Sequence, residues 1–180
     1  MKKSDKIDVL LTAKDKVLNT TCYYSYNYYW SHHYVGDVNN RFVFGIIEDD
    51  FILNGYIIRK LSRINKVLVR NDITEKIGEM LGIKNQINYP SININSWKDI
   101  FSNECFKDEL IELELYNDGT FYFGKVIEVN KNSILFLAFD ADGLWDKDKI
   151  KINYRDIDGI CWNSRYLNGW KYYFNSLNED

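Results

Sequence analysis

The sequence predicts a mainly β protein with short helices (α+β), organised as two tandem small barrels. We expect a short helix before each barrel, a helix that links them and a helix at the C-terminus. Three observations support this prediction. Segments such as 109–116 alternate apolar and polar residues with the period of a strand. The motif Phe-x-Phe-Gly occurs twice, in 41–47 and in 120–126. Each occurrence follows a segment with helical apolar spacing.

The composition is that of a folded protein. The chain has 180 residues, 46% of them hydrophobic and 27% charged, enough for one ordinary domain or two small ones. The net charge of −3 lacks the basic surplus of phosphate-binding proteins, so a nucleic acid partner is not expected. No apolar run reaches the roughly 18 to 20 residues of a membrane span, and 1–11 lacks the apolar core of a signal peptide. The three cysteines form no CxxC pair, so we expect a cytoplasmic protein with reduced thiols and no membrane contact.

The two predicted copies correspond at two places. Residues 41–47 (RFVFGII) resemble 120–126 (TFYFGKV), and 61–67 (LSRINKV) resemble 154–160 (YRDIDGI). The first pair is 79 residues apart and the second 93, which predicts a 14-residue expansion of the second copy, mostly within 140–149.

The first copy and its linking helix span 1–82. A helix is expected over 5–16, followed by strands that include the aromatic stretch 21–34 and the segment 41–47. Residues 71–82 predict the linking helix, with a capping box at Asp72 and Glu75 and a glycine at its end. The apolar stripe of this helix comprises Ile73, Ile77, Met80 and Leu81. Residues 83–95, which hold the only proline, are the expected linker.

The second copy, 96–180, has clearer signals. Ser96 is a plausible N-cap for a helix that places Trp97, Ile100 and Phe101 on one face. Strands follow at 109–116, 121–129, 133–139, 149–154 and 159–162, with a tight Asn-Asp-Gly turn at 117–120. The tail 164–177 predicts a helix with Leu167, Trp170, Phe174 and Leu177 on the side that docks on the barrel.

The second copy resembles the Sm-like fold, a helix followed by a bent five-stranded barrel, and SH3-like barrels share this pattern. The residues that carry the resemblance are spaced like the first Sm motif: Leu113, Asn117, Gly119, Gly124 and Asn132. The whole chain is similar to uncharacterised tandem small-barrel proteins of bacteria. The resemblance implies RNA binding through an Asp/Asn loop, where Asn132 would stand, and through an Arg-Gly pair. Arg155 is instead followed by Asp156, which departs from the family pattern.

The stretch 21–34 holds six tyrosines, a tryptophan and two histidines. At strand spacing Tyr24, Tyr26, Tyr28 and Trp30 share one face, which predicts a half-buried strand. An interface is the first alternative, since Tyr and Trp bury large areas and keep a polar group. Stacking on bases is the second, although no Lys or Arg occurs between Thr20 and Asn40. Adjacent histidines on a strand point to opposite sides, and a polar turn is the other interpretation of this pair.

The loop 140–149 is the second candidate interaction site, because loops often carry function. If Asp140 and Asp142 are aligned with positions 3 and 5 of an EF-hand loop, Ala138 and Lys149 occupy positions 1 and 12, where carboxylates are needed. No calcium site is therefore expected. The candidate interaction surface comprises Tyr23, Tyr29, Trp30, His32, His33, Asp140, Asp142 and Trp145. No catalytic residue, metal ligand or cofactor is predicted.

The function expected from these features is that of a cytoplasmic binding or scaffold protein. It would engage another protein through an aromatic surface or through the loop 140–149. The alternative is a degenerate Sm-like RNA-binding protein. An enzyme is not expected, because the sequence has no GxSxG, HExxH or phosphate-binding glycine loop, and no pairing of a histidine with a nucleophile is evident from the spacing.

Overall fold

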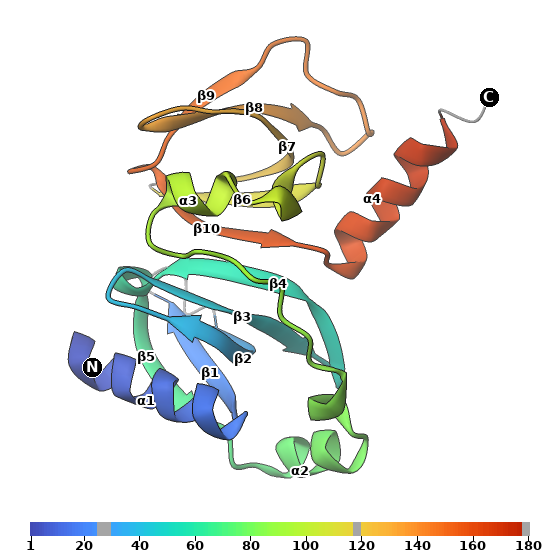
Figure 1. Cartoon of the computed structure of the whole chain (residues 1–180). Coiled ribbons are helices and arrows are strands. Elements are labelled where there is room, and N and C mark those ends of the chain that lie inside the picture. The colour runs from blue at the N-terminus through green and yellow to red at the C-terminus, as the bar shows by residue number, and fades with distance from the viewer. Residues whose placement is uncertain (25–29, 117–119, 178–180) are drawn as a thin grey trace. The chain divides into compact units, whose positions relative to one another are not determined.

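The computed structural model describes residues 1–24, 30–116 and 120–177, and the chain divides into two compact units. The first unit is Met1–Asn95 and the second is Ser96–Asp180. The fold is mixed α+β, as predicted. Within the described residues four α-helices accompany ten strands, which pair antiparallel within each unit (Figure 1).

The first unit begins with helix α1 and continues into five strands. The elements are α1 (Lys3–Lys16), β1 (Asn19–Tyr24), β2 (Trp30–Val38), β3 (Phe42–Asp49), β4 (Ile52–Lys60), the 3₁₀ turn η1 (Leu61–Arg63), β5 (Ile64–Val69), α2 (Ile73–Met80) and the 3₁₀ turn η2 (Ile83–Gln86). The strand order is β5-β1-β2-β3-β4. The segment after η2 packs on the same unit, where Tyr56 Oη donates to the Asn88 carbonyl at 2.8 Å.

Helix α1 packs on β1, β2 and β5 (Figure 1). Its buried positions are Lys6, Leu10 and Ala13, which lie on one helical face at i, i+4 and i+7. Leu10 and Ala13 are fully buried in a core that includes Val35 and Ile64. Leu11 is 39% exposed because it lies about 100° around the helix from Leu10.

The aromatic stretch is not one continuous strand, and that prediction was wrong. β1 ends at Tyr24, β2 begins at Trp30, and Tyr23 pairs with Trp30 across the two strands. Tyr24 is buried whereas Trp30 is 51% exposed, so the two do not share a buried face. Tyr26, Tyr28 and Tyr29 lie outside the described residues. The alternative of a polar turn at His32 and His33 is also wrong, since both lie within β2.

Helix α2 starts as predicted but exposes its apolar stripe. Asp72 Oδ1 accepts a hydrogen bond from the Glu75 amide at 2.9 Å, and Gly82 has φ +68° just after the helix. The buried residues of α2 are Glu75 and Gly78. All four residues of the stripe are exposed: Ile73 at 69%, Ile77 at 37%, Met80 at 87% and Leu81 at 56%.

The second unit repeats the sequence of one short helix and five strands. Its elements are α3 (Trp97–Phe101), the 3₁₀ turn η3 (Glu104–Phe106), β6 (Ile111–Leu115), β7 (Phe121–Val129), β8 (Ser133–Phe139), β9 (Ile150–Asn153), β10 (Ile157–Trp162) and α4 (Arg165–Ser176). The strand order is β10-β6-β7-β8-β9. The predicted turn at 117–119 lies outside the described residues.

The terminal helix docks on its own unit through most of the predicted residues. Ser164 Oγ accepts from the Leu167 amide at 3.2 Å and so caps α4. Leu167 is buried with Leu110 and Phe139, and Trp170 and Phe174 pack against this cluster. Leu177, predicted on the docking side, is 56% exposed because it follows the last helical residue.

The sheets are not closed into barrels by hydrogen bonds in the described residues. In the described part of the first unit, the outermost strands of the order, β5 and β4, do not pair with each other. The same holds for β10 and β9 in the second unit. The predicted alignment of 41–47 with 120–126 is wrong. Residues 42–45 lie in β3, the third strand of their unit, whereas 121–124 lie in β7, the second strand of theirs. The expansion assigned to 140–149 therefore has no basis.

Candidate functional site

The residues of the predicted interaction surface fall into both units. Tyr23, Trp30, His32 and His33 belong to the first unit and Asp140, Asp142 and Trp145 to the second. Tyr29 lies outside the described residues. Each unit therefore carries its own candidate residues.

In the first unit Trp30 is exposed and His33 is not. The Trp30 ring lies 4.7 Å from the half-buried His32 ring, measured between centroids. Lys66 Nζ lies 5.8 Å from the centre of the Tyr23 ring. His33 is fully buried, so its side chain is not part of any exposed surface.

His33 belongs to a buried polar cluster that the sequence spacing did not reveal. Ser31 Oγ lies 2.6 Å and Tyr24 Oη 3.1 Å from His33 Nε2. Burial, the nearby Arg59 guanidinium and His32 lower the pKa of His33 to about 3, so the ring is neutral near pH 7. A neutral histidine beside a serine has the parts of a nucleophile and base, but both side chains are buried. We interpret the cluster as structural.

The loop 140–149 of the second unit is held in a defined turn. Asp140 Oδ1 accepts hydrogen bonds from the amides of Asp142 and Leu144, each at 2.9 Å. A bridge joins Phe139 to Trp145, and Gly143 has φ +77°. Asp140 therefore shapes the loop, while Asp142 is exposed at its tip.

This loop lies directly against α4. A Cβ at Gly143 would stand 2.8 Å from the Trp170 ring and 3.0 Å from the Tyr173 ring. Tyr166, Trp170, Tyr173 and Leu177 follow helical spacing along one side of α4. Leu144 at the loop tip is 65% exposed, Tyr166 53%, Tyr173 42% and Leu177 56%. We call these residues, Leu144, Tyr166, Trp170, Tyr173 and Leu177, the α4–loop surface.

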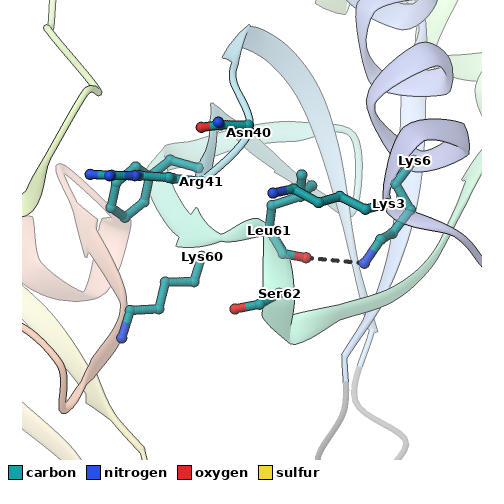
Figure 2. A pocket seen from close by; sticks show the side chains of 8 residues that line it. Lys3, Lys6, Asn40, Arg41, Lys60, Leu61 and Ser62 are labelled. Atoms are coloured by element: carbon teal, nitrogen blue, oxygen red, sulfur yellow. Dashed lines mark hydrogen bonds between the residues drawn. The ribbon is translucent and has the colours of Figure 1, made fainter.

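The first unit contains a cavity of about 440 Å³ with a basic lining (Figure 2). Three segments form it: the start of α1, the turn between β2 and β3, and the end of β4 with η1. Its lining comprises Lys3, Lys6, Asn40, Arg41, Phe42, Lys60, Leu61 and Ser62. Figure 2 shows Lys3 and Lys6 reaching from α1 toward Leu61. Four of the eight lining residues are basic and none is acidic.

Lys6 is the buried cation of this cavity. Its ammonium donates to the Leu61 carbonyl at 3.2 Å and to the Ile64 carbonyl at 2.5 Å. Burial and the neighbouring Lys3 lower the pKa of Lys6. These two carbonyl oxygens accept from two of its three N–H donors but do not neutralise its charge.

Sequence reasoning missed the cavity and the α4 side of the α4–loop surface, although one signal was present. The first unit has 13 Lys and Arg against 10 Asp and Glu, a net charge of +3, whereas the second has 10 against 16, a net of −6. The total of −3 hides this contrast. The charge of each unit separately would have indicated where to look.

Comparisons with known proteins give no relative to reason from. No family model, curated protein or solved structure matches the chain. Across the described ranges, no three His, Cys, Asp or Glu side chains gather where they could hold a metal ion. None of the described helices combines the length and the apolar character needed to cross a membrane.

Proposed function

We propose that this chain is a binding protein that engages another protein through the α4–loop surface of its second unit. The observation that carries the proposal is the row along α4 and the adjoining loop tip, in which Leu144, Tyr166, Tyr173 and Leu177 are exposed and Trp170 is half-buried. Contiguous exposed apolar groups mark interaction sites more often than scattered ones. Tyr and Trp are the residues that most often anchor such interfaces.

The charge of the second unit defines the chemistry of the partner. The unit has a net charge of −6, and Asp140, Asp142, Asp146 and Asp148 are exposed in the loop beside the apolar row. A partner with Lys or Arg around Leu, Phe or Trp would match both features, because opposite charges guide association and apolar anchors supply affinity. We therefore propose a basic protein segment with apolar anchors.

The negative charge of the second unit disfavours the alternative of a degenerate Sm-like protein that binds RNA near Asn132 and Arg155. Asn132 and Arg155, the residues nearest the Sm pattern, belong to the unit of net −6. RNA phosphates would be repelled by that unit at low ionic strength.

We propose further that the two units are copies of one small Sm-like or SH3-like barrel pattern. Both have the order of a fifth, first, second, third and fourth strand. Both close the turn between second and third strand with the same backbone bond, Asn39 to Phe42 at 2.9 Å and Asn130 to Ser133 at 2.8 Å. These turns are 91 residues apart, close to the 93 of the segment before the fifth strand. An offset of 91 to 93 residues therefore relates the two units, in place of the 79 residues that separate 41–47 from 120–126.

Selection of random phage-displayed peptides on the purified full chain tests the proposed function. Enriched peptides should combine Lys or Arg with Leu, Phe or Trp, and their affinity should fall as salt rises. Leu144→Ser and Tyr173→Ser should each weaken the selected peptides about tenfold or more, as loss of an interface anchor does.

Two matched variants identify the surface that binds. Tyr172→Ser removes a 79% exposed ring that lies off the proposed row, and Met80→Ser removes an 87% exposed apolar side chain of α2. Both should leave peptide affinity unchanged. Peptides that bind Leu144→Ser and the parent equally would contradict the proposal. Electrophoretic mobility with single-stranded RNA at two salt concentrations tests the alternative, which tight and steeply salt-dependent binding would favour.

A further inference from the structure

We propose that the basic cavity of the first unit binds a small ligand that carries a phosphate monoester or a comparable dianion. This site is independent of the α4–loop surface, since all its lining residues belong to the first unit. The inference rests on the charge, the donors and the size of the cavity.

Four of the eight residues that line the cavity are basic and none is acidic, although Asp5 lies nearby in the first turn of α1. Lys3 and Lys6 are one helical turn apart on α1, so their ammonium groups repel each other across the same face. In the described ranges no carboxylate forms an ion pair with Lys3, Lys6 or Arg41. An anion in the cavity would offset the repulsion between Lys3 and Lys6, whose side chains lie on the same face of α1.

Two further features favour an anion at this position. Helix α1 has 14 residues and begins at Lys3, so the positive end of its dipole is at the cavity. Its N-cap residue, Lys2, makes no side-chain capping bond that would occupy the first amides. The Asn40 amide and the Ser62 hydroxyl line the cavity as neutral groups that can donate to phosphate or hydroxyl oxygens.

The size and the floor of the cavity favour a small molecule over a nucleic acid strand. About 440 Å³ is within the range of small-ligand pockets. The floor is apolar but closed, because Phe42 is 4% and Leu61 1% exposed. Single-stranded nucleic acids need aromatic faces on which bases stack, and the Phe42 ring offers none.

Calorimetric titration of the full chain at near-physiological salt tests the proposal with defined probes. Ribose 5-phosphate should bind and ribose should not, because the pair differs only in the phosphate. Lys3→Gln and Arg41→Gln should each weaken ribose 5-phosphate about tenfold or more, the effect of losing one charge-assisted hydrogen bond. Lys16→Gln, an exposed lysine in the last turn of α1, should change nothing. Lys6 is left intact because its bonds to Leu61 and Ile64 support the fold.

Inorganic phosphate and a single-stranded RNA decamer complete the experiment. Binding of inorganic phosphate as tight as that of ribose 5-phosphate supports the site, with free phosphate as its source. Two results would overturn the proposal. One is an affinity for ribose 5-phosphate that is undetectable at millimolar concentration or unchanged in a folded Lys3→Gln/Arg41→Gln variant. The other is RNA that binds more tightly than the small probes and displaces them, which would assign the cavity to a nucleic acid strand.

Discussion

Replacing Gly124 by alanine tests the close approach of two strands in the second unit. A Cβ at this position would stand 2.0 Å from the Leu137 carbonyl oxygen and 2.8 Å from Ala138 Cα. Both atoms belong to the backbone of β8, which pairs with β7 at Gly124 and Ala138. The contact cannot be relieved by a side-chain rotation, so the two strands must separate locally.

The expected cost follows from what that separation disrupts. Overpacking of a core costs about 1 to 3 kcal/mol, and each weakened ladder bond adds about 0.5 to 1.5 kcal/mol. Gly124→Ala should therefore lower the free energy of unfolding by about 3 kcal/mol. Urea denaturation followed by tryptophan fluorescence is a suitable assay, since Trp97, Trp145, Trp162 and Trp170 all lie in this unit.

Gly169→Ala is the matched control within the same unit. Gly169 lies inside α4 with nothing within 4 Å of an added Cβ, so alanine should raise stability by about 0.5 to 1 kcal/mol through helix propensity. The same chemical change should thus have opposite signs at the two positions. A Gly124→Ala protein with the urea midpoint of the parent would refute the strand geometry described for β7 and β8.

Two further predictions concern the first unit. His33 has its pKa lowered from 6.5 to about 3 in the folded state, so below pH 6.5 the unfolded chain takes up a proton that the folded chain does not. This contribution to stability is complete above pH 6.5 and is lost as pH falls; it should remove about 2 kcal/mol between pH 7 and pH 5. Urea midpoints at both pH values check this, and His33→Gln should show a smaller pH dependence. Phe51, at φ +64° in the turn between β3 and β4, is strained, so Phe51→Gly should raise the thermal midpoint by the equivalent of about 1 kcal/mol. A lower midpoint would show that packing of the Phe51 ring outweighs the strain.

Local signals predicted most elements because each depended on a few neighbouring residues. The Ser96 cap accepts from the Asp99 amide at 3.1 Å, and Trp97, Ile100 and Phe101 are buried as their spacing indicated. The 133–139 strand and the terminal helix also lie where expected.

Tertiary pairing was the part that local patterns could not determine. Phe-x-Phe-Gly appears in β3 and in β7 for a shared physical reason: a glycine is needed wherever the second and third strands of a unit approach closely. Gly45 satisfies this need from the third strand, against the Tyr34 carbonyl, and Gly124 from the second strand, against Leu137. The same Phe-x-Phe-Gly motif therefore occurs in strands that are not equivalent in the two units. The turns at Asn39 and Asn130 relate the two units better than the Phe-x-Phe-Gly motif does. They can be recognised as equivalent only once the strand pairing is known.

The candidate sites were predicted only in part for a similar reason. The sequence pointed to the loop 140–149 as a candidate site, but the apolar side chains beside it on α4 are about 25 residues further along the chain. The α2 stripe had the periodicity of a packed face, yet Glu75 faces inward, where Lys84 pairs with it at 3.2 Å. Periodicity identifies a face but does not say what covers it.

Hydrogen–deuterium exchange of the full chain, alone and with a selected basic peptide, tests the central claim most directly. If a basic partner binds the α4–loop surface, amide exchange should slow within 140–149 and 165–176 and remain unchanged in α2. Slower exchange confined to residues 1–95, or no change at a saturating peptide concentration, would contradict the account.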